Sequence, residues 1–303
     1  MNENNCCCSS SKCCTTATIQ TVSTQLTFKD MLGGWKVRWG IGRMNYKIDA
    51  GLYAIGTPNQ ASPILVSANY KLTFDLLRKE LEGVNCWLLI LDTKGVNVWC
   101  AAGKGTFSTV ELLNRISLTN LTEVTSQRTL ILPQLGASGI NASEVKQKSG
   151  FSVVYGTVRA NDIKAFLEAD NKATEEMRTV KFTMRDRLVL TPMEIVPTVP
   201  KAFIGFGILF LINLFATKPF GLIDVIAFVG AILIGTFVTP ILLPFVPSHA
   251  FSFKGGIAMN FTGSSTYTSP SGVLKEMKIA LPIIIVSSLV GAILVLLNRI
   301  WGI

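Results

Sequence analysis

An unbroken apolar run of strand length lies at residues 86–92, Cys86-Trp-Leu-Leu-Ile-Leu-Asp92. Comparable runs lie at Ile64–Ala68, Thr129–Leu132 and Phe151–Tyr155, and amphipathic stretches with helical spacing separate them. Strands that are apolar on both faces and alternate with helices are typical of a parallel sheet covered by helices on both sides. The sequence therefore predicts an α/β fold with a Rossmann-like open sheet that is mostly parallel.

The overall composition indicates that part of the chain lies in lipid. Hydrophobic residues make up 49% of the 303 residues, charged residues make up 16%, and the mean hydropathy is +0.43, which is too apolar for a wholly water-soluble protein. Apolar stretches lie at residues 202–216, 222–246 and 279–297. The last two are long enough to cross a hydrocarbon core of about 30 Å, and the first is borderline. We expect a transmembrane domain of about three helices at residues 202–303.

Positive charge is distributed unevenly around these apolar stretches. The chain has 28 Lys and Arg against 19 Asp and Glu, a formal charge of +9. Near the apolar stretches, most basic residues lie before residue 202 or at residues 248–278. The positive-inside rule then predicts a multi-pass protein of the inner (cytoplasmic) membrane whose N-terminal domain is cytoplasmic. The basic residues form no dense cluster with interleaved aromatics, which argues against nucleic-acid binding.

Cysteines are concentrated near the start of the chain. Five of the seven lie in a tail rich in Ser, Thr and Asn, and the odd total is unlike a secreted disulfide framework, so the pattern indicates a reducing compartment. The chain also begins without the basic and apolar regions of a signal peptide. We expect a disordered tail at residues 1–27, a cytoplasmic domain at 28–187 and a Pro-marked linker at 188–201. The seven cysteines are Cys6, Cys7, Cys8, Cys13, Cys14, Cys86 and Cys100.

The most distinctive stretch follows the apolar run and reads Gly95-Val-Asn-Val-Trp-Cys-Ala-Ala-Gly-Lys-Gly105. After it, Ser108-Thr-Val-Glu111 has the pattern of a capping box, in which the Ser hydroxyl and the Glu carboxylate each satisfy a backbone N–H at a helix start. Cys100 is therefore predicted at a strand-to-helix junction on the carboxyl edge of the sheet, where open α/β folds bind ligands. The stretch has the spacing of neither a P-loop nor a dinucleotide-binding glycine motif.

Residue chemistry alone leaves three roles open for Cys100. It can be a buried structural residue, a catalytic nucleophile, or a thiolate ligand to a soft transition metal. A nucleophile needs a nearby base, and the single histidine, His249, lies in the apolar half of the chain. The small residues after Cys100 would let a broad, flat ligand approach the backbone closely.

The octet Asn97-Val-Trp-Cys-Ala-Ala-Gly-Lys104 resembles the signature of the HgcA family, the membrane-anchored corrinoid proteins of mercury methylation. The resemblance covers roughly residues 45–303, and the octet is its most specific part. A weaker resemblance exists to the large subunit of the corrinoid iron–sulfur protein of acetyl-CoA metabolism. Other stretches that carry the HgcA resemblance are Gly51-Leu-Tyr-Ala-Ile-Gly56, Pro63-Ile-Leu-Val-Ser-Ala-Asn-Tyr70, Leu132-Pro-Gln-Leu-Gly-Ala137, Ser149-Gly-Phe-Ser-Val-Val-Tyr-Gly156, Arg187-Leu-Val-Leu-Thr-Pro192 and Met259-Asn-Phe-Thr-Gly-Ser-Ser-Thr-Tyr-Thr-Ser269.

The HgcA resemblance implies a corrinoid (cobalamin-type) cofactor bound to residues 28–187, with the Cys100 thiolate as the lower axial ligand of cobalt. A thiolate opposite the methyl group would favour methyl transfer to Hg(II), giving methylmercury, so the implied enzyme is a corrinoid-dependent methyltransferase. The implied partners are a ferredoxin-like iron–sulfur protein as electron donor, a methyltetrahydrofolate-linked methyl donor and membrane lipid. The resemblance implies that Cys100 is the catalytic and metal-binding residue. The implied cofactor-binding residues are Asn97, Val98, Trp99, Cys100, Ala101, Ala102, Gly103, Lys104, Gln134 and Gly136.

Two other functions stay open. The first is a corrinoid methyl carrier of one-carbon or acetyl-CoA metabolism, although the cysteine tail lacks the spacing of an iron–sulfur site. The second is a membrane transporter or adaptor for a soft metal. All seven cysteines lie before residue 202, so the predicted membrane spans offer no thiol to carry a soft ion across a bilayer.

Overall fold

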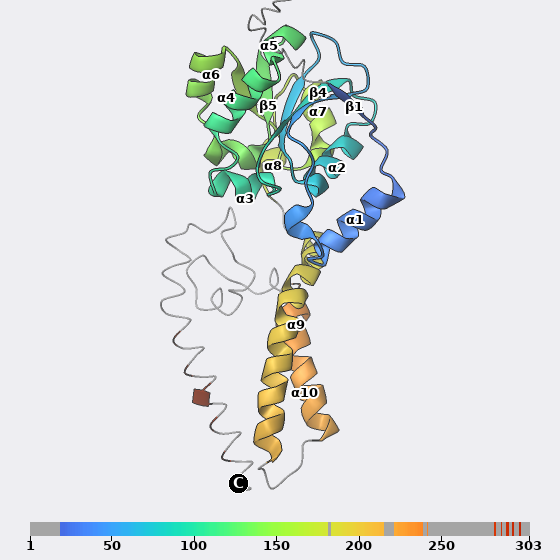
Figure 1. Ribbon diagram of the computed structural model, residues 1–303, viewed down its shortest axis with the longest axis vertical. Coiled ribbons are helices and arrows are strands. Elements are labelled where there is room, and N and C mark those ends of the chain that lie inside the picture. Colours follow the sequence, from blue (N-terminus) through green and yellow to red (C-terminus); the bar gives the residue numbers. More distant parts are fainter. Residues whose placement is uncertain are drawn as a thin grey trace, which may run out of the picture. The chain divides into compact units, whose positions relative to one another are not determined.

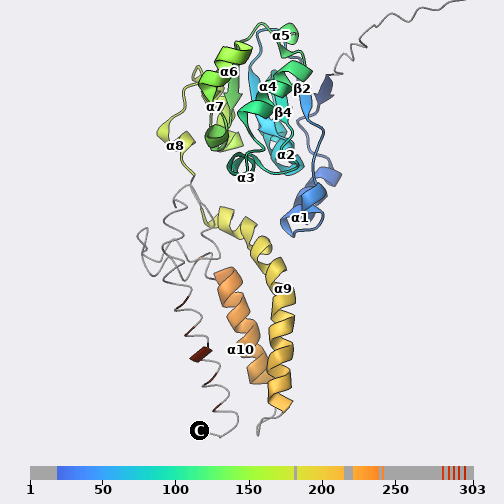
Figure 2. The same ribbon diagram turned by 60° about the vertical axis from the view of Figure 1, so that its left-hand side comes forward.

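The computed structural model describes residues 19–180, 183–214 and 221–238, together with isolated positions between 241 and 297. The chain forms two compact units. The first contains the residues up to Gly34 and Gly42–Thr179, and the second contains Trp35–Ile41 and the residues from Val180 onward. Figures 1 and 2 show strands and helices alternating in the first unit and long helices in the second.

The strands of the first unit follow the predicted apolar runs closely. Strands β3 (Ile64–Ala68) and β5 (Thr129–Leu132) have the predicted bounds, while β4 (Cys86–Leu91) and β6 (Ser152–Tyr155) each differ by one residue. The other two strands are β1 (Gln20–Val22) and β2 (Gly51–Ile55). The helices are α1 (Phe28–Arg38), α2 (Lys71–Glu80), α3 (Val98–Gly103), α4 (Thr109–Leu118), α5 (Leu121–Val124), α6 (Ala142–Ser149), α7 (Ile163–Glu168) and α8 (Glu175–Arg178), with 3-10 turns η1 (Arg43–Asn45), η2 (Gln134–Gly139) and η3 (Ala160–Asp162).

The strands form one six-stranded sheet in the order β1-β2-β4-β3-β5-β6. Strand β3 pairs in parallel with both β4 and β5, and the pairs β1–β2 and β5–β6 are also parallel. Only β2 and β4 are antiparallel among the described strands, with Tyr53 opposite Leu88. The prediction of a mostly parallel open sheet is confirmed.

Strand β4 is apolar throughout because both of its faces are buried. Successive side chains of a strand point to opposite faces, so β4 contributes to two separate cores. Helices α3, α4, α5 and α6 pack into one core, and α2 and α7 pack into the other. The first core takes Trp87, Leu89 and Leu91, and the second takes Cys86, Leu88 and Ile90.

Ordered structure begins before the predicted boundary at residue 28. Residues Gln20–Val22, which we expected in the disordered tail, form the edge strand β1 and pair with β2. A strand of three residues gives only a weak sequence signal, because it is too short to show an alternating pattern. The rest of the predicted tail, residues 1–18, lies outside the described residues.

The predicted linker at residues 188–201 lies inside a helix of the second unit, α9 (Met184–Leu214). Helix α9 bends by 48° between Met184–Met193 and Ile195–Leu211. Pro197 accounts for the bend, because it has no N–H to donate to the carbonyl of Met193 and its ring crowds that carbonyl. The prolines that suggested a linker therefore bend the helix without ending it.

The described part of the second unit also contains α10 (Leu222–Leu233) and a π-helical turn, η4 (Ile234–Val238). Among the described residues, no single helix is long and apolar enough to cross a bilayer, although the two segments of α9 together have the required length and composition. Helix α10 with η4 is apolar but shorter. The third predicted span, residues 279–297, lies outside the described residues apart from isolated positions, so the three-helix transmembrane domain stays a prediction.

Candidate functional site

The candidate site lies where connections leave the sheet on opposite faces. The chain leaves β3 into α2 on one face and leaves β5 into η2 and α6 on the other. Open α/β sheets bind ligands in the crevice at such a switch point, outside the carboxyl ends of the strands. A mainly apolar pocket of about 300 Å³ opens there. Its walls include Ser67 of β3, Leu132 of β5 and Thr157 after β6.

Asn69 organises the loop that leads from β4 to Cys100. This side chain is buried, and its Oδ1 accepts hydrogen bonds from the backbone N–H groups of Thr93 at 3.1 Å and Gly95 at 2.9 Å. Its Nδ2 donates to the carboxylate of Asp92 at 3.0 Å. Gly95 has a φ of 74°, a left-handed conformation that favours glycine. The loop is thus fixed to the end of the neighbouring strand β3.

The predicted capping box at Ser108 and Glu111 is only half formed. Ser108 Oγ accepts a hydrogen bond from the backbone N–H of Glu111 at 3.3 Å and so caps α4 as predicted. The Glu111 carboxylate instead accepts from the backbone N–H of Asp92 at 2.9 Å and from Arg115 at 2.7 Å. The charged guanidinium one turn along α4 makes a stronger hydrogen bond than a neutral N–H, which explains the departure. Glu111 therefore ties α4 to the loop after β4.

Cys100 lies on the short helix α3, past the carboxyl end of β4. Asn97 caps α3, since its Oδ1 accepts a hydrogen bond from the backbone N–H of Cys100 at 3.0 Å. The Cys100 side chain is exposed, whereas Cys86 is fully buried, and burial raises the pKa of Cys86 to about 12. The predicted junction position of Cys100 is confirmed, and its exposure excludes the buried structural role.

Three members of the octet face the protein core. Val98, Ala101 and Ala102 are at most 7% exposed and pack in the core on one face of the sheet. Helical spacing turns these three positions to the same side of α3. Ala101 and Ala102 are enclosed by protein, and their part in binding a ligand stays a prediction.

Turn η2 packs closely against the segment that follows α3. A Cβ at Gly136 would lie 2.6 Å from the Phe107 ring, and a Cβ at Gly139 would overlap the Phe107 carbonyl oxygen. Packing therefore accounts for the glycine at position 136, and its predicted contact with the cofactor stays a prediction. Gln134 differs, because its buried Oε1 has no hydrogen-bond partner among the described residues. A buried acceptor without a donor is costly, and Gln134 Oε1 lacks an N–H partner in this part of the chain, although Gln134 is not among the residues that line the pocket.

The remaining predicted site residues divide between the pocket and the surface beside it. Asn97, Val98 and Trp99 line the pocket, together with the carboxyl ends of β3 and β5. Cys100, Gly103 and Lys104 are exposed next to it. The structure therefore brings part of the octet to the switch point and leaves the Cys100 thiol accessible from the same edge of the sheet.

Sequence reasoning missed the residues that other strands contribute to this edge. Asn69 and Pro133 each stand directly after a predicted strand, and Thr157 stands two residues after another. That position was the signal in the strand pattern, because the carboxyl ends of parallel strands meet at one edge of a sheet. Pro133 and Thr157 line the pocket, and Asn69 holds the loop that precedes α3.

The region around this site is similar to subunits of acetyl-CoA decarbonylase/synthase complexes and to a corrinoid/iron-sulfur protein. Residues 42–167 match the family described as CO dehydrogenase/acetyl-CoA synthase delta subunit. An acetyl-CoA decarbonylase/synthase complex subunit gamma from Methanocaldococcus jannaschii is 33% identical over 122 residues, which cover 40% of this chain and 25% of the relative. The corresponding subunit from Methanopyrus kandleri is 31% identical over 126 residues, 41% of this chain and 27% of the relative. A corrinoid/iron-sulfur protein large subunit from Moorella thermoacetica is 27% identical over 126 residues, 41% and 28% of the two chains.

The chain spans about a quarter of the length of these relatives. The matched residues 42–167 include the sheet from β2 to β6, helix α3 and the residues of η2. The names of the relatives agree with the weaker of the two sequence resemblances, the one to the corrinoid iron–sulfur protein. None of the three names refers to mercury, so mercury as the methyl acceptor gains no support from them.

Proposed function

We propose that the first unit binds a corrinoid over the carboxyl edge of its sheet and acts as a methyl carrier in one-carbon metabolism. The observation that carries the proposal is the exposed thiol of Cys100 beside a pocket at the switch point of an open, mostly parallel sheet. The similarity to a corrinoid/iron-sulfur protein large subunit supports this class of cofactor.

The residues at the site fit a corrinoid in three respects. The Cys100 sulfur is a soft donor suited to a transition metal, and its exposure makes it reachable. The unpaired Oε1 of Gln134 can accept a hydrogen bond from one of the amide side chains at the corrin periphery. The pocket beside Trp99 is mainly apolar, and its volume of about 300 Å³ lies at the lower end of the range for ligand pockets.

In this proposal the Cys100 thiolate would bind the cobalt of the corrinoid. When bound, the corrinoid would supply a methyl group, and a thiolate donor to its metal would favour transfer of that methyl group, with the bonding electron pair, to an electrophile. The chain's own residues hold the ligand in place. Asn97 orders the start of α3, while Asn69 and Glu111 fix the loop that precedes it.

The visible absorption spectrum tests the cofactor and its ligand together. The full chain is purified in detergent and loaded with a cobalamin, as wild type and as Cys100→Ala. We expect both proteins to retain corrinoid and only the wild type to show a shift of the corrin bands. Cys86→Ala is the matched control, because it removes a buried thiol and should keep the shift. Identical spectra for wild type and Cys100→Ala would reject thiolate ligation, and a folded chain that retains no corrinoid would reject the cofactor.

Inorganic Hg(II) is the methyl acceptor that we propose. The octet around Cys100 supports it through its resemblance to the HgcA family, and Hg(II) is a soft ion that accepts a methyl group with its electron pair. Protein loaded with a methylated corrinoid is incubated with Hg(II), and methylmercury is measured by mass spectrometry. We expect methylmercury from the wild type and none from Cys100→Ala. A loaded wild-type protein that yields none would remove mercury from the proposal and leave the methyl carrier.

The apolar helices α9 and α10 support a membrane location for the chain. We propose that they anchor it in the inner (cytoplasmic) membrane with the first unit on the cytoplasmic side. A ferredoxin-like iron–sulfur protein would then supply electrons, and a methyltetrahydrofolate-linked donor would supply methyl groups. Retention of the full chain in membranes after alkaline carbonate extraction is the expected result, and its release would contradict the anchor.

A further inference from the structure

Helix α1 carries an apolar stripe on its outer face. Phe28, Met31, Leu32 and Trp35 recur at helical spacing and span an arc of about 100°. Their side chains are 76%, 55%, 39% and 56% exposed. An ordinary surface helix turns its apolar stripe toward the core, so α1 has the opposite orientation.

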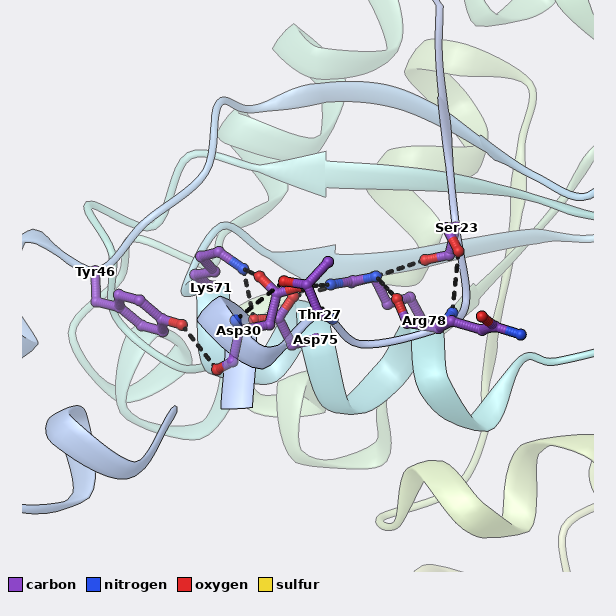
Figure 3. A network of polar contacts seen from close by, with 8 residues as sticks. Ser23, Thr27, Asp30, Tyr46, Lys71, Asp75 and Arg78 are labelled. Carbon is purple, nitrogen blue, oxygen red and sulfur yellow. Dashed lines mark hydrogen bonds and ion pairs between the residues drawn. The ribbon is translucent and has the colours of Figure 1, made fainter. Parts of the chain in front are cut away.

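On its other face, the part of α1 that belongs to the first unit is held to α2 by ion pairs, as Figure 3 shows. The carboxylate of Asp30 lies 2.6 Å from Lys71 and 2.7 Å from Arg78, and Asp75 pairs with the same two cations at 2.6 and 2.9 Å. Burial alone would raise the pKa of Asp30, but hydrogen bonds from Lys71 and Thr27 outweigh it and hold this pKa well below its usual value. The charge of Asp30 is therefore compensated inside the protein.

A close approach of Tyr46 fixes which face of α1 points inward. A Cβ at Gly33 would overlap the Tyr46 hydroxyl, so this position accepts only glycine without a shift. The Tyr46 hydroxyl donates a hydrogen bond to the backbone carbonyl of Asp30 at 3.5 Å. Because Gly33 and Asp30 face inward, helical geometry turns the apolar stripe outward. The exposure of the stripe is thus built into the packing of the helix.

Basic residues border the stripe on both edges. Lys29 and Lys36 lie along one edge and Arg38 along the other, and Asp30, the only acidic residue of α1, is engaged in the internal ion pairs. An apolar stripe bordered by Lys and Arg is typical of a helix that lies in a lipid interface. Long basic side chains can follow the stripe and place their charges at headgroup phosphates.

We propose that α1 lies in the headgroup region of a bilayer that contains anionic lipid. Its apolar stripe inserts among the upper acyl chains, and the bordering cations pair with the phosphates. This contact does not depend on the corrinoid, and it is separate from any anchoring by α9 and α10. The charge on the two edges favours an anionic lipid surface as the occupant over an apolar protein groove.

Quenching of Trp35 by brominated lipid tests the contact. The full chain is reconstituted into mixed phosphatidylcholine and phosphatidylglycerol vesicles, with or without bromine on the acyl chains. The difference between wild type and Trp35→Phe isolates the emission of Trp35. We expect bromine to remove at least about half of that emission, since the apolar face of an interfacial helix reaches about 5–10 Å below the surface. Trp87, buried in the sheet, is the control: the difference between wild type and Trp87→Phe isolates its emission, which bromine should not change.

Charge reversal and a second quencher separate the possible outcomes. The double variant Lys29→Glu, Lys36→Glu should show severalfold less quenching of Trp35, and so should the wild type in vesicles of phosphatidylcholine alone. Trp35 that bromine does not quench but that is shielded from acrylamide would be covered by protein, which would overturn the proposal. Trp35 that acrylamide quenches freely would lie in water, and that result would overturn it as well.

Discussion

Cys86 and Cys100 lie at opposite ends of one strand–loop–helix segment and differ in their surroundings. Cys86 begins β4, is fully buried, and has a pKa raised to about 12. Cys100 lies on α3 past the other end of β4, and its side chain is exposed. The chemistry available to each cysteine therefore follows from the edge of the sheet on which it lies, since the carboxyl edge carries the loops and the pocket.

Thiol alkylation should show the largest difference between the two residues. At about pH 8, Cys100 should react with iodoacetamide at least about a thousandfold faster than Cys86, because the reaction needs an accessible thiolate and Cys86 is both buried and protonated. Peptide mapping by mass spectrometry follows each cysteine separately in the native full chain. Similar rates for the two would break the comparison.

The substitution Asn69→Ala should destabilise the loop before Cys100. It removes the acceptor of the Thr93 and Gly95 N–H groups and a donor to Asp92, so the free energy of unfolding should fall by about 2–4 kcal/mol. Hydrogen exchange at the Gly95 amide and thermal unfolding measure the local and the global effect.

Asn85 offers a matched control for Asn69 at the other end of β4. Its Oδ1 accepts one hydrogen bond, from the backbone N–H of Thr57 at 2.9 Å, and the bond is exposed. The substitution Asn85→Ala should therefore cost about 1 kcal/mol or less. Equal losses for the two variants would mean that Asn69 has no special part in ordering the site.

Stability should decrease as the pH rises through the alkaline range, because of Cys86. The unfolded thiol ionises near 9.0, whereas the folded thiol stays protonated up to about 12, so the native state binds more protons over this window. The contribution of Cys86 to the free energy of unfolding is therefore fully present below pH 9.0. Above pH 9.0 it decreases by up to about 1.4 kcal/mol per pH unit. The free energies of unfolding of wild type and Cys86→Ala, measured across this window, isolate the effect. A constant difference between the two proteins would contradict it.

Removal of the α3 cap should have the smallest effect and should be local. Asn97→Ala should cost about 1 kcal/mol and speed the alkylation of Cys100, whose N–H the cap holds. Ser108→Ala removes the equivalent cap of α4 and should cost a similar amount without changing Cys100. If both variants alter Cys100 equally, the cap of α3 does not control the geometry of the thiol.

The central strands were predictable because both of their faces are buried. An uninterrupted apolar run such as the one at β4 follows directly from burial on two sides, and β3 and β5 gave the same signal. The antiparallel direction of β2 was not predictable. The direction of pairing depends on the connection between strands, and the pattern of apolar and polar side chains does not report it. Helix α9 was not predicted over its full length, because its prolines indicated a linker. In the structure these prolines lie inside the helix and bend it without ending it.

The candidate site was predictable only in its local part. Asn97 and Ser108 cap helices where their residue types and spacing indicated. Glu111 and Asn69 acquire their roles from groups distant in the sequence, Asp92 and the loop after it, so no local pattern reports them. The inward direction of Ala101 depends on the phase of a six-residue helix, which composition alone does not set.

The glycines of η2 affect how this site would appear in a survey of tolerated substitutions. Gly136 and Gly139 have no room for a Cβ, because Phe107 lies against both. In a library of random variants they should be depleted as strongly as Cys100, although neither has a side chain to offer a ligand. A map of substitution tolerance would then show the two packing glycines and Cys100 as one cluster of intolerant positions. The fit around Phe107 is what distinguishes the residues that shape the edge from Cys100, the residue proposed to bind the cofactor there.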